Sequence, residues 1–142
     1  MSAALAWLAS PRVMRVTRLT LGLVFVIAAL TKVGDVAWFG QQVHNYRIVP
    51  DWAENLLTIV LPWIELVAGL ALVTGVRARA GAVVALALML VFTVAVGAAW
   101  ARGLDFRCGC FGKVGAATIG AHKFLENLGL TLLAWLAARA TR

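Results

Sequence analysis

Two cysteines separated by one glycine, Cys108-Gly109-Cys110, bring the most reactive side chains in this sequence together. Gly109 has no Cβ and can adopt a positive φ, so the two thiols can converge on a small strained disulfide or on one soft metal ion. Strain raises the reduction potential of a disulfide. Such a short ring also restricts the unfolded chain very little, so it would stabilise the fold little. Both arguments favour a redox-active disulfide over a structural one. Arg107 beside the pair should favour the thiolate. An incidental pair of small apolar residues is the ordinary alternative.

Charged side chains within apolar stretches are the second set of candidates. Glu65 lies inside such a stretch, three residues after Pro62, and an unpaired carboxylate there is costly. It could relay a proton, hydrogen-bond a quinone or pair with Lys32, or it could simply bridge two helices. Lys32 lies near the end of another stretch, where a lysine ordinarily extends its amine to the membrane surface. Asp35 follows three residues later, on the same face of one helix.

His122 is the remaining candidate, at the start of the last apolar stretch and close in sequence to the cysteines. An imidazole there could protonate a leaving thiolate or bind a metal ion, although a lone histidine near an interface usually does neither. The sequence contains no Walker loop, GxSxG or HExxH motif. Thiol chemistry is therefore better supported than hydrolysis or nucleotide binding.

The elements that position these residues follow from composition. Of 142 residues, 63% are hydrophobic and 13% charged, with a mean hydropathy of +0.91, whereas soluble domains average roughly 45–50% apolar and about 25% charged residues. This excludes a soluble enzyme, a disordered chain and a secreted disulfide scaffold. The pattern predicts an all-α, integral membrane four-helix bundle forming one domain over residues 1–142, with spans at about residues 19–38, 55–76, 80–101 and 118–138.

Basic residues suggest how the bundle is oriented. An even number of spans puts both termini on one side, and seven basic residues without an acid fall there: Arg12, Arg15, Arg18, Arg77, Arg79, Arg139 and Arg142. The other side has six basic and five acidic residues. We expect both termini in the cytoplasm and the loops at about 39–54 and 102–117 outside, so the cysteines face the oxidising side. The net charge of +7 then reflects membrane orientation, and no nucleic-acid partner is expected.

Over about residues 18–133, the sequence resembles the MauE/DoxX family of redox-associated membrane proteins. The resemblance lies in ALTKVGD around Lys32, LPWIELVAGL around Glu65, and RGLDFRCGCFG around the cysteines. It implies a four-helix protein of the bacterial inner membrane that acts in the periplasmic thiol–disulfide system with a thioredoxin-like partner. Some relatives are linked to quinone-coupled sulfur oxidation, so a quinone is a possible cofactor. Quinone-coupled bundles relay electrons through two cysteine pairs, whereas this chain has one.

The leading hypothesis is therefore a membrane thiol–disulfide redox protein, or its accessory, in which Cys108 and Cys110 cycle between dithiol and disulfide. In this hypothesis Glu65 and Lys32 line a cavity beneath the cysteine loop. One alternative is a protein that handles Cu(I) or another metal ion through the same two thiolates. Another is a structural subunit of a larger membrane complex, in which the cysteines are dispensable.

Overall fold

The computed structural model describes residues 3–106 and 118–140, and every regular element in those ranges is a helix. The prediction of an all-α fold is confirmed. The helices are α1 (Ala3–Leu8), α2 (Pro11–Gly34), α3 (Val36–Tyr46), α4 (Asp51–Thr74), α5 (Ala78–Ala101) and α6 (Ala121–Ala140).

Three of the described helices are long and apolar enough to cross a membrane: α2, α4 and α5. Each has 24 residues, which at about 1.5 Å per residue exceeds the ~30 Å hydrocarbon core of a bilayer. Their most apolar windows have mean hydropathies of 1.9, 2.3 and 2.6. The fourth predicted span, at 118–138, corresponds to the shorter α6, whose first turns contain two charged residues, Lys123 and Glu126.

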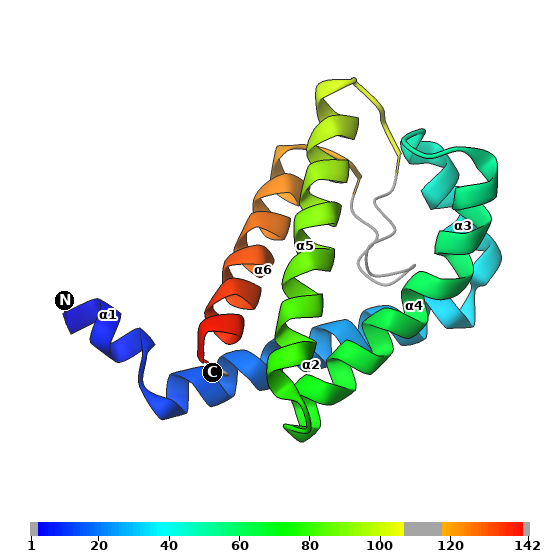
Figure 1. Ribbon diagram of the computed structural model, residues 1–142. Helices are drawn as coiled ribbons and strands as arrows, with labels where there is room; N and C mark the ends of the chain where they lie inside the picture. The colour runs from blue at the N-terminus through cyan, green and yellow to red at the C-terminus, as the bar shows by residue number, and fades with distance from the viewer. Residues whose placement is uncertain (1–2, 107–117, 141–142) are drawn as a thin grey trace.

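The four longest helices form two antiparallel pairs, α2 with α4 and α5 with α6 (Figure 1). Contacts of α4 with α5 and of α2 with α6 join the pairs. Glycines allow α2 and α4 to touch through their backbones: a Cβ on Gly69 would lie 2.9 Å from the carbonyl oxygen of Gly22. Small residues commonly permit such close approach between helices in membranes.

The first predicted span has different bounds in the structure. Helix α2 begins at Pro11 and ends at Gly34. Ser10 is its N-cap, and the Ser10 hydroxyl accepts a hydrogen bond from the Val13 amide at 3.4 Å. Asp35 then caps α3 by accepting a hydrogen bond from the Trp38 amide at 3.0 Å. Two corrections follow. The span expected at 19–38 is interrupted at Asp35, and much of the loop expected at 39–54 is helix α3.

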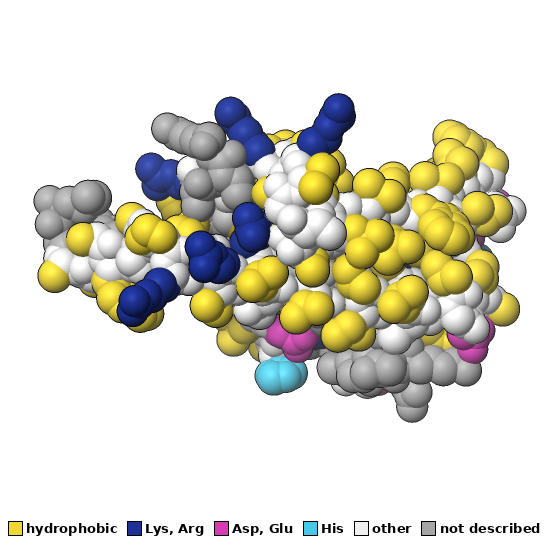
Figure 2. Space-filling model, turned by 90° about the horizontal axis from the view of Figure 1, so that it is seen from below, with side chains coloured by type: hydrophobic (Ala, Val, Ile, Leu, Met, Phe, Trp, Pro, Cys, Tyr) yellow, Lys and Arg dark blue, Asp and Glu magenta, His cyan; other side chains and the backbone are white. Residues whose placement is uncertain are grey.

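Arginines mark the end of the molecule where α2 starts and the α4–α5 turn lies. Arg77 lies in the turn and Arg79 in the first turn of α5. A Cβ placed on Gly75 would lie 3.4 Å from the guanidinium of Arg18 in α2. Figure 2 shows Lys and Arg side chains gathered over one part of this face and hydrophobic side chains over most of the rest. The chain thus has a basic end and a broad apolar surface, as expected of a protein anchored in lipid.

Candidate functional site

A buried ion pair joins α2 to α4 in the interior of the protein. The Nζ atom of Lys32 lies 2.7 Å from both carboxylate oxygens of Glu65. The two side chains are only 0% and 2% exposed. Lys32 therefore does not extend to the membrane surface, because a carboxylate on the neighbouring helix is within reach. The expectation that Lys32 and Asp35 share one face of a single helix is wrong, because α2 ends at Gly34 and Asp35 is the N-cap of α3.

Two aromatic rings complete the surroundings of the ammonium group. The Nζ atom of Lys32 lies 5.2 Å from the ring centroids of Phe39 in α3 and Phe92 in α5. A desolvated cation over an aromatic face gains energy from the ring quadrupole. Lys32 consequently connects α2 to three other helices: to α4 through Glu65, and to α3 and α5 through the rings.

Helix α6 adds two buried polar residues that the sequence reasoning did not place in the site. Lys123 and Asn127 are each 1% exposed and lie four residues apart, on one helix face. The Lys123 ammonium donates to Glu126 Oε1 at 3.1 Å and is close enough to Lys32 for the two charges to repel. The i, i+4 spacing of Lys123 and Asn127 was the available signal. It was missed because a lysine in the first turn of a span resembles an interfacial anchor.

Two cavities adjoin the ion pair. One of about 10 Å³ is lined by Glu65 and Asn127 together with apolar side chains that include Phe25 and Met89. The other, of about 150 Å³, lies among α3, α4 and α5, and Lys32 is the single charged residue in its lining.

The walls of the larger cavity are apolar and aromatic, with Phe39, Phe92 and Tyr46 among them. Burial raises the pKa of the Tyr46 phenol above its ordinary value, so this residue stays neutral. The cavity can therefore take a small apolar ligand with a polar group directed at Lys32.

The cysteine motif and its neighbour, Arg107 to Cys110, lie outside the described residues. Both flanks of that segment are held together, since the Ile119 amide donates to the Phe106 carbonyl at 2.9 Å. The Phe106 ring packs edge-on against Tyr46, with ring centroids 4.7 Å apart. Arg102 also donates to the backbone carbonyl of Tyr46 at 3.0 Å. The structure thus fixes both ends of the cysteine segment beside the end of α3, where Tyr46 also lines the larger cavity.

His122 lies apart from the buried polar group that Lys32, Glu65, Lys123 and Asn127 form. Its side chain is exposed in the first turn of α6, whereas the following residue, Lys123, points inward. The buried group of Lys32, Glu65, Lys123 and Asn127 therefore forms without the histidine.

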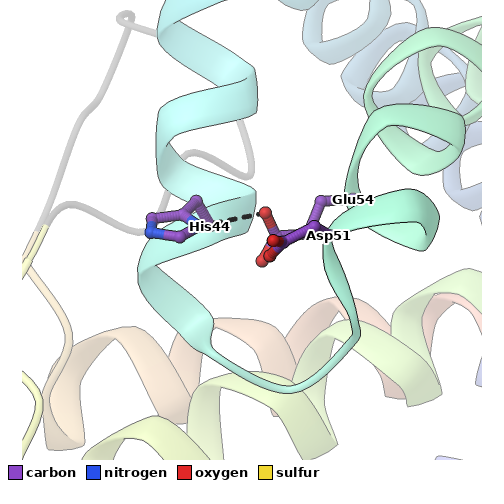
Figure 3. A group of neighbouring side chains, drawn as sticks. All are labelled: His44, Asp51 and Glu54. Carbon is purple, nitrogen blue, oxygen red and sulfur yellow. Dashed lines mark hydrogen bonds and ion pairs between the residues drawn. The ribbon is translucent and has the colours of Figure 1, made fainter.

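A second polar group, at the α3–α4 junction, was not anticipated from the sequence. His44 Nδ1 lies 3.0 Å from Glu54 Oε2, and Asp51 lies alongside (Figure 3). One potential ligand atom from each residue lies within 4.8 Å of the others. The three could hold a metal ion, but the His44 side chain is 59% exposed, and its contact with Glu54 already serves to join α3 to α4.

Comparison with known proteins links the chain to one family. A family model described as methylamine utilisation protein MauE matches residues 10–140. The protein of that name from Paracoccus denitrificans is 38% identical over 129 residues, which cover 90% of this chain and 69% of the relative. The relative from Methylorubrum extorquens is 35% identical, covering 93% and 74%, and that from Methylophilus methylotrophus is 30% identical, covering 84% and 64%. No solved structure matches.

Proposed function

The chain belongs to the MauE family of methylamine utilisation proteins, and from that premise we propose that it is a membrane thiol–disulfide redox protein, or the accessory of one, that acts on a thioredoxin-like partner. The observation that carries the proposal is the Cys108-Gly109-Cys110 motif on a segment whose flanks, Phe106 and Ile119, are held together beside Tyr46. Such anchoring would keep a reactive segment at one place on the protein.

The proposed exchange is balanced between four sulfur atoms. A thiolate of the partner attacks one sulfur of the Cys108–Cys110 disulfide, and the other cysteine leaves as a thiolate. The second partner thiolate then resolves the mixed disulfide. Two electrons have passed from the partner to the cysteine pair, and the same steps in reverse return them. Arg107 favours the thiolate form, and Gly109 allows the small ring to close.

A quinone is the proposed electron acceptor for the reduced pair, taking two electrons and two protons. Support comes from the 150 Å³ cavity, because its walls suit an apolar ring and Lys32 could donate a hydrogen bond to a ring oxygen. Glu65 holds the Lys32 ammonium by two of its hydrogens, so an ammonium with three donors has one more to offer. In this proposal Lys32 and Glu65 are binding and positioning residues, and the cysteines carry the chemistry.

We also propose the location: the inner membrane of a bacterium, with both termini in the cytoplasm and the cysteine segment on the periplasmic side. The arginines at the α2 start and the α4–α5 turn support this orientation, because basic residues are enriched in cytoplasmic loops. The cysteine segment follows α5 at the opposite end of that helix, where an oxidising compartment would allow its disulfide to persist.

Trapping of the partner tests the proposal. In membranes from cells that make Cys108→Ser or Cys110→Ser protein, the remaining thiolate can attack the disulfide of the oxidised partner, and one partner sulfur leaves as a thiolate. The missing cysteine cannot complete the exchange, so we expect the mixed disulfide with a thioredoxin-like protein to accumulate on non-reducing gels. The double variant is the matched control and should form none. If neither single variant forms an adduct and both single variants support growth on methylamine, the redox role fails and the structural-subunit alternative gains. Copper that co-purifies with wild type but not with the double variant would favour metal handling instead.

A further inference from the structure

Asn127 of α6 has an unusual environment for a polar side chain. The residue is 1% exposed, and neither its amide oxygen nor its amide nitrogen has a hydrogen-bond partner in the described part of the protein. A buried amide that gives up its bonds to water without replacement is strongly unfavourable. A group that the described residues do not provide is therefore expected beside it.

The small cavity lies where that group would have to be. Asn127 and Glu65 are among its lining residues, and the other lining residues are apolar. Its volume of about 10 Å³ is at the lower limit for holding one water molecule. Nothing larger than a water molecule fits. The neighbouring cations Lys32 and Lys123 also argue against a metal ion, because their charges would repel it.

Glu65 has hydrogen-bonding capacity to spare. A carboxylate offers about four acceptor positions, and Lys32 occupies one on each oxygen. A water molecule in the cavity would thus find an acceptor on Glu65 and both a donor and an acceptor on Asn127. Buried waters typically make about three hydrogen bonds, and this site supplies them.

We propose that the cavity binds one ordered water molecule, which donates to the Glu65 carboxylate and bonds to the Asn127 amide. Through this water, the ion pair between Lys32 of α2 and Glu65 of α4 is connected to Asn127 of α6. Asn127 is then a positioning residue: it holds the water on Glu65 and so couples the helix that follows the cysteine segment to the ion pair. The inference is independent of the thiol chemistry proposed above.

The replacement Asn127→Leu distinguishes a hydrated cavity from a dry one. If the cavity is dry, leucine removes two unpaired polar atoms and adds apolar contact, so the unfolding temperature rises. If the water is present, leucine leaves it or the Glu65 oxygen unpaired, and the unfolding temperature falls by about 5 °C. Gln42→Leu is the matched control, because Gln42 is also a buried amide with an unpaired oxygen but does not line this cavity.

Infrared spectroscopy provides a readout that would not change if Asn127 had only a structural role. Loss of a hydrogen bond from water shifts the antisymmetric stretch of a carboxylate to higher frequency, so the difference spectrum between wild type and Asn127→Leu should show that shift. Gln42→Leu should not show it. An unchanged carboxylate band in folded Asn127→Leu would overturn the proposal. If that variant does not fold, a diffraction map of the wild-type protein decides: density for a water between Glu65 and Asn127 supports the site, and an empty cavity refutes it.

Discussion

Replacing Lys32 with methionine should destabilise the protein more than any change to its surface ion pairs. The substitution removes the ammonium and leaves the Glu65 carboxylate, whose side chain is 2% exposed, without its partner. Breaking a buried pair from one side costs about 3–5 kcal/mol, because the remaining charge is uncompensated. The substitution also removes two cation–π contacts at 5.2 Å, which add to the loss.

The double variant Lys32→Met/Glu65→Leu makes the prediction specific. Replacing both members of a buried pair with apolar residues of similar size is often neutral or stabilising. We therefore expect the double variant to recover most of the 3–5 kcal/mol lost in Lys32→Met. Such recovery would show that the cost lies in an unpaired charge and that the two side chains interact directly.

The assay is reversible unfolding in mixed micelles with increasing denaturing detergent, followed by tryptophan fluorescence, for wild type, both single variants and the double variant. His44→Ala is the control, because it breaks a contact in which the His44 side chain is 59% exposed, and such pairs contribute about 0–1 kcal/mol. Strictly additive losses in the double variant, or a Lys32→Met loss no larger than that of His44→Ala, would refute the buried pair.

Two further predictions concern packing and pH. Gly69→Ala should destabilise the protein by about 1–3 kcal/mol, because the new Cβ would lie 2.9 Å from backbone atoms of α2. Gly129→Ala, with nothing within 4 Å of its Cβ, should be neutral or slightly stabilising in the same unfolding assay. Tyr46 is the one tyrosine in the chain and burial raises its pKa, so tyrosinate absorbance should develop only above pH 10 in the folded protein. The unfolded chain ionises first, and stability should therefore fall as pH rises through that range; titration at pH 10 in the folded state would contradict this.

Composition alone was sufficient to predict a helical membrane protein. The apolar stretches are long, and their charges are few enough for length and hydropathy to place α4 and α5 within a few residues. The break at Asp35 was not predictable in the same way. The residues on both sides continue a helical pattern, and Asp35 resembled a charge at a membrane surface rather than the N-cap of a new helix.

The buried polar group was predictable only in part. An intramembrane glutamate demands a partner, so pairing of Glu65 with Lys32 was one of several interpretations. The burial of Lys32 depends on a residue 33 positions away, and the ordinary behaviour of lysines at span ends argued against it. For Asn127 the spacing of four residues from Lys123 was the one available signal, because an amide becomes unusual only once its surroundings are known to be closed.

The redox state of Cys108 and Cys110 in native membranes tests the central claim most directly. Membranes are equilibrated in buffers of defined ratio of oxidised to reduced glutathione, quenched with acid and labelled with a maleimide that adds mass to each free thiol. The proposed function predicts that the protein changes between a doubly labelled and an unlabelled form in one two-electron step, and that each single serine variant loses this behaviour. Two free thiols in every buffer would contradict it.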